Sequence, residues 1–266
     1  MVSLFKQIKA LCVREVKYKE SDKILTLITA EEGKITVTAR GALKKDCRFA
    51  AAARSPVFAD YTLNSTGGHW YIKEAETIEL FSGLSSDYLG YSLACYFCEV
   101  LEELSDSDFP NPDILRLGLN ALYAISRSLY PLNQIKAVFE LKMASLSGFE
   151  PEVGVCCICG EEYPETPALS LEGGIMHCIS CPPGTAGKSE VLSADVLQAM
   201  RRTFDVDIKR IFSFSLPEEE LRRLARVSEN YLITQLGRGF GSLDYYNSAA
   251  RLMSPGIKSE NTEKKQ

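Results

Sequence analysis

The sequence predicts an α+β protein of more than one domain, with a five-stranded β-barrel at its N-terminus and an all-α domain that carries a cysteine-rich insertion. Three observations support this fold class. Short alternating β-branched segments run from Phe5 to Leu80, the hydrophobic period turns helical beyond Leu80, and paired cysteines interrupt the helical part. We expect a barrel domain over residues 1–80, a helical domain over 81–253 with the insertion at 153–184, and a flexible tail over 254–266.

A hairpin signal identifies the centre of the predicted barrel. Two β-branched runs are joined by a short acidic segment that ends in Gly33, a residue that suits the turn. The five expected strands are 8–16, 24–29, 34–39, 57–63 and 69–78. Five short strands with one long basic connection over 40–55 favour the OB-fold, although the pattern alone leaves an SH3-like barrel open.

Helical periodicity and capping residues place the elements beyond Leu80. The first helix has Ser85 or Ser86 as its expected cap. The later helices are expected to open at Asn111-Pro112, at Pro131 with a stop at Gly148, at Ser193, near Ile208 and at Pro217 with Gly237 as C-cap. The glycine-rich run 237–241 is interpreted as a loop, with phosphate binding as the second choice.

The cysteines of the insertion have the spacing of a metal site. Cys156, Cys159, Cys178 and Cys181 form the pattern C-x2-C-x18-C-x2-C. Two residues between thiolates allow both sulfurs of a pair to face one tetrahedral ion, and two such pairs complete a four-coordinate site. We therefore expect one structural Zn²⁺ in a zinc ribbon over 153–184. Cys157 and His177 each adjoin a proposed ligand and remain possible substitutes for it.

Cys95 and Cys98 also have C-x-x-C spacing, but they stand alone within a strongly amphipathic helical pattern. Core packing is therefore the simpler interpretation. A redox or metal role for this pair stays open as an alternative.

The charge is unevenly distributed along the chain. The formal net charge of −5 argues against a polyanion ligand, yet residues 1–54 hold 12 Lys and Arg against 6 Asp and Glu, whereas residues 55–266 hold 18 against 29. The first segment therefore carries +6 and the remainder −11. Such a division favours a contact with nucleic acid or another anionic surface that is confined to one domain.

The sequence gives little support for an enzyme. Its two histidines, His69 and His177, lie in a predicted strand and beside a proposed zinc ligand, which leaves no base for a Ser-His-Asp arrangement. No phosphate-binding or metalloprotease motif is present. No apolar run approaches a membrane span and no signal peptide is recognised, so we expect a cytoplasmic protein without a membrane partner.

Cations and aromatic rings are interleaved on the predicted hairpin and its long connection. They are Lys17, Tyr18, Lys19, Lys23, Lys34, Arg40, Lys44, Lys45, Arg48, Phe49 and Arg54. Lys and Arg neutralise phosphates, and rings stack on bases. The alternative is that these cations only keep the barrel surface soluble, and spacing does not separate the two.

Several motifs together resemble one bacterial family. The N-terminal ones are Lys17-Tyr18-Lys19-Glu20-Ser21-Asp22-Lys23-Ile24-Leu25-Thr26-Leu27, Glu32-Gly33-Lys34, Ala39-Arg40-Gly41-Ala42 and Arg48-Phe49. The later ones are Phe139-Glu140-Leu141-Lys142, Leu146-Ser147-Gly148-Phe149-Glu150-Pro151, Cys156-x-x-Cys159-Gly160 and Gly173-Gly174 before Cys178-x-x-Cys181. Taken in order from about Lys6 to about Leu236, they resemble the RecO recombination-mediator family.

This resemblance implies an OB-fold, a helical domain with an inserted zinc ribbon, and a non-enzymatic role in DNA repair and recombination at the nucleoid. It implies binding to single- and double-stranded DNA, strand annealing, contact with the C-terminal tail of single-strand-binding protein, and RecA loading with RecR and possibly RecF. The family's DNA contacts lie on the barrel. The positions that carry over are Lys34, Arg40, Lys44, Lys45, Arg48, Lys23 and Tyr18.

Two other hypotheses remain. One is a zinc-containing protein-interaction scaffold whose barrel binds no nucleic acid. The other is a thiol redox protein, which would lack stoichiometric zinc.

Overall fold

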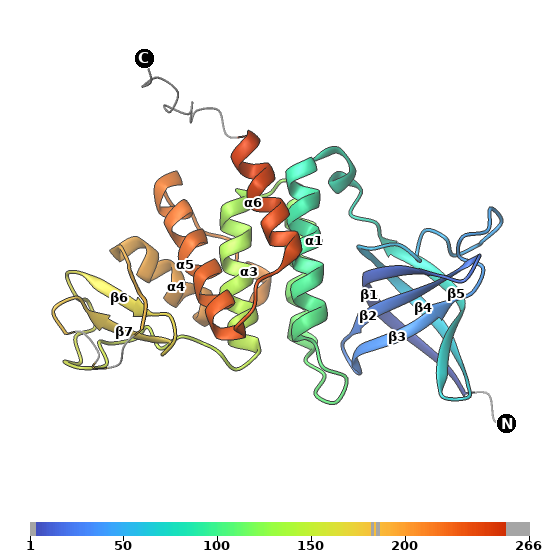
Figure 1. Ribbon diagram of the computed structural model, residues 1–266, viewed down its shortest axis with the longest axis horizontal. Helices are drawn as coiled ribbons and strands as arrows, with labels where there is room; N and C mark the ends of the chain where they lie inside the picture. The colour runs from blue at the N-terminus through green and yellow to red at the C-terminus, as the bar shows by residue number, and fades with distance from the viewer. Residues whose placement is uncertain (1–3, 182–183, 185–186, 254–266) are drawn as a thin grey trace, which may run out of the picture.

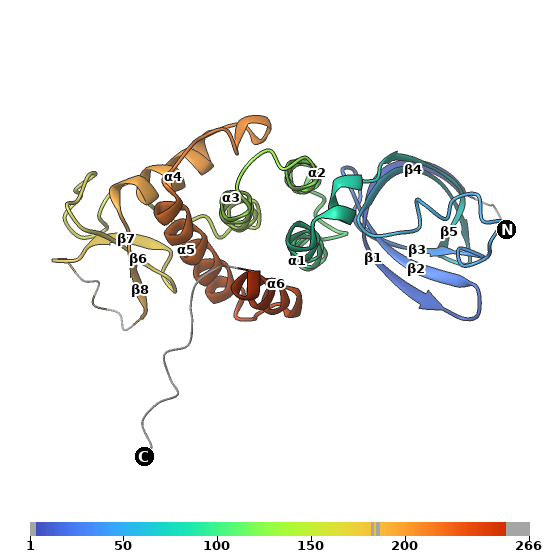
Figure 2. The same cartoon turned by 90° about the horizontal axis from the view of Figure 1, so that it is seen from above.

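The computed structural model describes residues 4–181, 184 and 187–253, and the expected tail over 254–266 lies outside these residues. Figure 1 shows three regions in a row, with the barrel at one end, a bundle of helices in the middle and a small sheet at the other end. The view from above in Figure 2 shows the same order.

Five strands form the barrel: β1 (Leu4–Tyr18), β2 (Asp22–Thr29), β3 (Gly33–Ala39), β4 (Val57–Thr66) and β5 (His69–Glu79). Their order is β1-β2-β3-β5-β4, and β1 pairs with β4 to close the sheet. Only the β3–β5 pairing is parallel. This five-stranded closed barrel confirms the predicted fold class, and Gly33 adopts the positive φ of 59° expected in the hairpin turn.

The barrel interior is filled from alternate positions of its strands. Leu25, Leu27, Val37 and Leu63 are fully or almost fully buried there. The connection 40–55 contains turns and no strand, and it inserts Ala52 and Ala53 into the same core. The Tyr61 hydroxyl donates to the Ala52 carbonyl at 2.8 Å, which fastens this connection to β4.

A short 3-10 turn, η1 (Ser82–Ser86), leads into the helical domain. Its elements are α1 (Tyr88–Leu104), α2 (Pro112–Ser126), α3 (Leu132–Leu146), α4 (Ala194–Asp205), η2 (Ile208–Arg210), α5 (Glu218–Leu236) and α6 (Gly241–Met253). The predicted caps of α2 and α4 are confirmed, since the Asn111 and Ser193 side chains accept from backbone N–H groups of the first turn. Gly237 ends α5 in the left-handed conformation.

Two expectations about the helices are corrected. Ser85 and Ser86 lie inside η1, and the N-cap of α1 is Asp87, whose carboxylate accepts from Gly90 N at 3.0 Å. The sequence prediction also missed α6, which begins at Gly241, directly after the glycine-rich loop.

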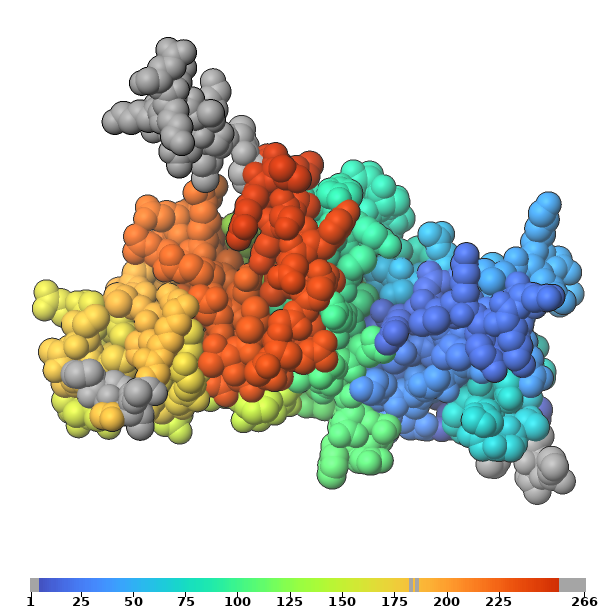
Figure 3. Space-filling model, viewed as in Figure 1, coloured from blue at the N-terminus to red at the C-terminus, as the bar shows by residue number. Residues whose placement is uncertain are grey.

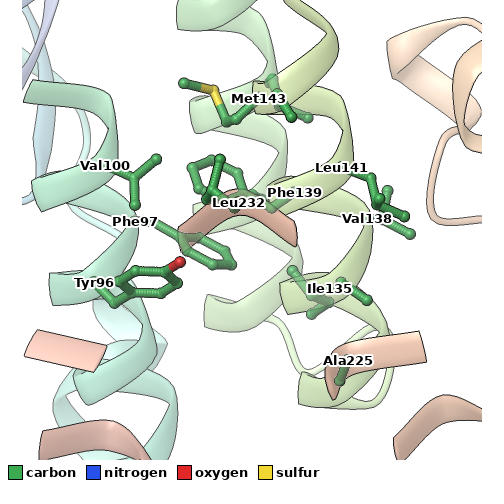
Figure 4. Packing of buried hydrophobic residues seen from close by; sticks show 14 of the residues in the cluster. Tyr96, Phe97, Val100, Ile135, Val138, Phe139, Leu141, Met143, Ala225 and Leu232 are labelled. Carbon is green, nitrogen blue, oxygen red and sulfur yellow. The ribbon is translucent and has the colours of Figure 1, made fainter. Parts of the chain in front are cut away.

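One hydrophobic core joins the helices and extends to the barrel. Figure 4 shows Phe97 of α1 and Phe139 of α3 within it, and their rings stack with centroids 3.8 Å apart. Leu11, Val13 and Ile28 lie on the outer surface of β1 and β2 and belong to this helical core instead of the barrel interior. Helices therefore cover this part of the outer face of β1 and β2.

A buried polar cluster ties three of the helices together. The Lys136 ammonium contacts the Glu140 carboxylate at 2.8 Å and Glu229 at 2.7 Å. Glu140 also accepts from the hydroxyls of Tyr96, at 2.9 Å, and Ser228, at 2.6 Å. Because every charge here has a partner, the cluster fixes the mutual register of α1, α3 and α5.

The cysteine-rich insertion forms a three-stranded sheet at the end opposite the barrel. Its strands are β6 (Pro167–Ser170), β7 (Ile175–Cys178) and β8 (Ser189–Val191), in the order β7-β6-β8. Arg201 of α4 docks this ribbon, since its guanidinium donates to the carbonyls of Val153 at 2.8 Å and of Gly154 and Glu162 at 2.6 Å. Across the described residues, no helix is long and apolar enough to span a bilayer.

Candidate nucleic-acid face and metal centre

A groove of about 490 Å³ lies on the outer face of the barrel, away from the helices. It crosses β2 and β3 and is bounded by the β1–β2 turn on one side and the β4–β5 turn on the other. Its lining residues are Tyr18, Lys19, Asp22, Ile24, Thr36, Thr38, Arg40, Gly68, His69, Trp70 and Tyr71. The β2–β3 face between these two turns is where OB-folds bind oligonucleotides.

Cations pair with aromatic rings around this groove. The Arg40 guanidinium lies 3.8 Å from the centre of the Tyr71 ring, and the Lys19 ammonium lies 5.0 Å from that of Tyr18. Lys6 lies 4.7 Å from the centre of the Trp70 ring. The first two pairs offer a positive charge to a phosphate beside a ring on which a base can stack, whereas the Lys6 ammonium is already paired with the Glu32 carboxylate.

A second hollow of about 570 Å³ continues from the groove, because Arg40 and Asp22 line both. Lys44, Arg48 and Lys73 add three more cations there, against Asp46 and Glu74. The connection 40–55 thus extends the positive surface around the side of the barrel.

Asp22 has a structural role at the centre of this surface. Its Oδ1 accepts from Gly41 N at 2.7 Å and from the Ser21 hydroxyl at 3.2 Å. The bond from Gly41 is the main reason why the pKa of this carboxyl lies below its ordinary value, followed by the bond from Ser21. The carboxylate therefore joins the β1–β2 turn to the start of the 40–55 connection.

The structure places the predicted DNA-binding residues in different surroundings. Tyr18 and Arg40 line the groove, Lys44 and Arg48 line the adjoining hollow with Arg40, and Lys45 is exposed on the same connection. Lys23 and Lys34 have other partners. The Lys23 ammonium pairs with Glu15 and donates to the Ala53 carbonyl at 2.9 Å, with its side chain only 13% exposed.

Lys34 lies on the side of the barrel that faces the helices. Its ammonium donates at 2.7 Å to the carbonyl of Glu102, in the last turn of α1, and its backbone N–H donates to Asp106 O at 3.2 Å. A cation at a helix C-terminus offsets the negative end of the helix dipole. The structure therefore shows Lys34 as a link between the barrel and α1.

Sequence reasoning did not single out Trp70, Tyr71 or Lys73 as binding residues. All three lie on β5, which reaches the groove through its short parallel pairing with β3, where Val37 lies opposite Trp70 and Thr38 opposite Tyr71. The adjacent aromatic residues Trp70 and Tyr71, which closely follow the Gly67-Gly68 turn, are the sequence signal that could have indicated a stacking site.

The four cysteines predicted as ligands converge at the end of the ribbon. The Sγ atoms of Cys156, Cys159, Cys178 and Cys181 all lie within 4.8 Å of one another. The Cys159 and Cys178 sulfurs are 3.6 Å apart. Thiolates at about 2.3 Å from a tetrahedral ion are separated by about 3.8 Å, so the donor set fits a four-coordinate metal.

The two proposed substitutes lie outside this ligand group. The ring of His177 is buried, with Nδ1 2.9 Å from the Cys178 carbonyl and Nε2 3.0 Å from the Ser189 hydroxyl. Cys157 is exposed, and its backbone N–H donates to Met176 O at 2.9 Å. Both ring nitrogens of His177 are thus engaged within the ribbon sheet.

The local backbone stabilises a thiolate at the first ligand. Hydrogen bonds from backbone N–H groups, first that of Cys159 and then those of Ile158 and Cys178, lower the pKa of Cys156 to about 6. The Cys156 sulfur is then negatively charged beside three further sulfurs, and a bound cation would neutralise this charge.

Comparison with known proteins agrees with this architecture. The family model described as "Recombination protein O N terminal" matches residues 1–81, and "Recombination protein O C terminal" matches residues 85–244. The chain belongs to the recombination protein O family. Within this RecO family, the N-terminal model spans all five barrel strands, and the C-terminal model spans the helices from η1 into α6 together with the ribbon.

Curated RecO relatives match along most of their length. The DNA repair protein RecO of Clostridium novyi is 27% identical over 252 residues, which cover 94% of this chain and 96% of the relative. That of Acetivibrio thermocellus is 25% identical over 243 residues, or 91% and 96% of the two chains. That of Listeria monocytogenes is 29% identical over 223 residues, or 84% and 86%. RecO family membership is consistent with work in DNA repair and recombination.

Proposed function

We propose that this chain is a non-enzymatic mediator of DNA repair and recombination. In this proposal it binds single- and double-stranded DNA, anneals complementary strands and, with RecR and RecF, promotes the loading of RecA onto strands coated by single-strand-binding protein, whose C-terminal tail it contacts.

The groove across β2 and β3 is the observation that carries this proposal. It combines the cations Lys19 and Arg40 with three rings, Tyr18, Trp70 and Tyr71, on the outer face of an OB-fold. Phosphate neutralisation and base stacking need no particular sequence, which suits a protein that anneals arbitrary strands. We place Arg40, Lys44, Lys45, Arg48 and Tyr18 in contact with DNA, and we leave Lys23 and Lys34 out of the contact because their ammonium groups are engaged elsewhere.

We further propose that the metal of the ribbon is one Zn²⁺ with a structural role. Four thiolates without a histidine or carboxylate leave no open position for a reacting water. The ion would hold together the two ends of the ribbon, and Arg201 would fix the ribbon on α4.

A salt titration of single-stranded DNA binding tests the proposal. Binding through phosphates should weaken steeply with salt, and Arg40→Glu with Lys44→Glu should reduce the affinity at least about tenfold and flatten the salt slope. The matched control is Lys9→Glu with Lys209→Glu, which makes the same charge change at exposed cations on β1 and η2, outside the groove. The control should bind DNA almost as wild type does.

The same variants separate the mediator from the scaffold that binds no nucleic acid. A flat salt response, or equal DNA affinity in both variants, would favour the scaffold. Annealing of DNA coated with single-strand-binding protein, measured with and without RecR, then tests the finer role. We expect the groove variant to be defective in both reactions.

A further inference from the structure

An apolar patch is exposed at the outer end of the ribbon. Val155, Ile158 and Ile179 are 50%, 59% and 54% exposed. Val155 precedes the first cysteine pair, and the two isoleucines lie inside the two pairs. Because the four sulfurs of these pairs converge, the three side chains belong to one end of the ribbon, which we call the ribbon tip. Exposed apolar patches of this kind mark surfaces that a partner covers.

The chain segment around this tip is acidic, and the Arg201 cation that packs on it from α4 is engaged with the carbonyls of Val153, Gly154 and Glu162. Residues 143–187 contain no Lys and no Arg, but they contain six acidic residues: Glu150, Glu152, Glu161, Glu162, Glu165 and Glu172. Phosphate backbones would be repelled here, so DNA is excluded as the ligand. A partner for the ribbon tip must combine positive charge with an apolar or aromatic surface.

The chain itself carries such a surface at its other end. The barrel groove has Tyr18, Trp70 and Tyr71 beside its cations, and residues 1–54 carry a net charge of +6. Figures 1 and 3 show the ribbon and the barrel at opposite ends of an elongated molecule, with the helices between them. The two surfaces cannot meet within one chain, although they can meet between two copies.

We propose that the ribbon tip docks on the barrel groove of a second copy, so that DNA-free chains associate head to tail. The contact joins two different surfaces, so it leaves a free groove at one end and a free tip at the other, and longer assemblies can form. Complementary charge would make the association sensitive to salt.

This inference rests on the proposed function in one respect. If the groove binds single-stranded DNA, DNA and the ribbon tip compete for it, and DNA releases single chains from the assembly. The association would then keep the groove covered until a single strand is available.

Sedimentation velocity of the full chain tests the contact. At about 0.05 M salt the average mass should rise above the 29.5 kDa of one chain as concentration increases, and at about 0.5 M salt, where the screening length is roughly threefold shorter, association should weaken at least about tenfold. Adding oligo(dT) at low salt should return the protein to complexes that contain one chain each.

Mixing two variants tests the head-to-tail geometry. The tip variant is Ile158→Ser, Ile179→Ser and Glu162→Gln, and the groove variant is Arg40→Ala with Lys44→Ala. Each alone should stay monomeric, whereas their mixture should form dimers, because one intact tip can meet one intact groove. A control with Leu252→Ser and Glu219→Gln removes an exposed apolar group and an exposed carboxylate elsewhere, and it should associate as wild type does.

The possible results are distinct. Wild type that remains monomeric at low salt, or a mixture of variants that fails to associate, overturns the contact. Wild type that associates but does not bind oligo(dT) overturns the proposed function and leaves the contact standing. Zinc content and circular dichroism of the tip variant show whether its ribbon is folded.

Discussion

Lys34 shows how a residue's role depends on contacts that are distant in sequence. Its position on a basic hairpin predicts a DNA contact, yet its ammonium lies 2.7 Å from the Glu102 carbonyl at the end of α1. The adjacent Gly33 approaches the same region so closely that an added Cβ would lie 1.7 Å from Asp106 O. The hairpin turn therefore serves as the joint between the barrel and the helices.

We predict that Lys34→Ala lowers stability without affecting DNA binding. The substitution removes a hydrogen bond from a charged donor to a helix C-terminus, so the free energy of unfolding should fall by about 1–2 kcal/mol. The affinity for single-stranded DNA should change by less than about twofold, because the groove keeps its cations. Urea denaturation and fluorescence anisotropy of labelled DNA provide the two measurements.

Lys45 offers the matched comparison, since it is exposed on the 40–55 connection. Lys45→Ala should leave stability within about 0.5 kcal/mol and should weaken DNA binding. The opposite pattern, in which Lys34→Ala keeps its stability but binds DNA more weakly, would show that Lys34 contacts DNA.

At the scale of elements, local signals predicted most of the helices and strands. Gly33 marks the hairpin turn, while Asn111 and Ser193 mark helix starts, because turn and cap chemistry involve residues that are near in sequence. Helix α6 was missed because it opens at a glycine after a glycine-rich loop and buries only Leu243, Tyr246 and Ala249. Three buried residues are too few to give a clear helical period in the sequence. The helix is recognised only from its packing on α1.

The candidate site was predictable where it depends on one continuous segment. Arg40, Lys44 and Arg48 follow the hairpin directly, and all three line the groove or the hollow beside it. Trp70 and Tyr71 reach the groove only through the parallel pairing of β5 with β3. A pairing between strands that are distant in sequence leaves no local pattern, which explains why Trp70 and Tyr71 were not predicted as binding residues, whereas Tyr18 was.

For the ribbon, we predict that its fold depends on its metal. Wild type should contain one equivalent of zinc by elemental analysis, and Cys159→Ser should lose it. Because metal-binding energy is folding energy in so small a unit, the variant ribbon should unfold locally and thermal stability should fall. DNA binding by the barrel should persist, since the groove shares no residue with the ribbon. Unchanged zinc content and stability in Cys159→Ser would contradict the structural site.

At the scale of the whole molecule, the division of charge coincides with the arrangement of the parts. The segment with a net charge of +6 forms most of the barrel, and the ribbon, which over residues 153–184 has four Glu and no Lys or Arg, lies at the far end (Figure 3). Helices cover Leu11, Val13 and Ile28 on the outer face of β1 and β2. Within the described residues, the groove brings the rings of Tyr18, Trp70 and Tyr71 together with Lys19 and Arg40 in one hollow, which is why we assign DNA to the groove.

Trp70 allows the central claim to be tested directly, because it is the only tryptophan of the chain and it lines the groove. We predict that titration with oligo(dT) quenches the Trp70 fluorescence through stacking, with the same apparent affinity that anisotropy of labelled DNA reports, and that salt reverses the quenching. The variant Arg40→Glu with Lys44→Glu should shift the quenching curve to higher DNA concentration. DNA that binds by anisotropy while the Trp70 signal stays constant would contradict the account, because DNA would then bind outside the groove.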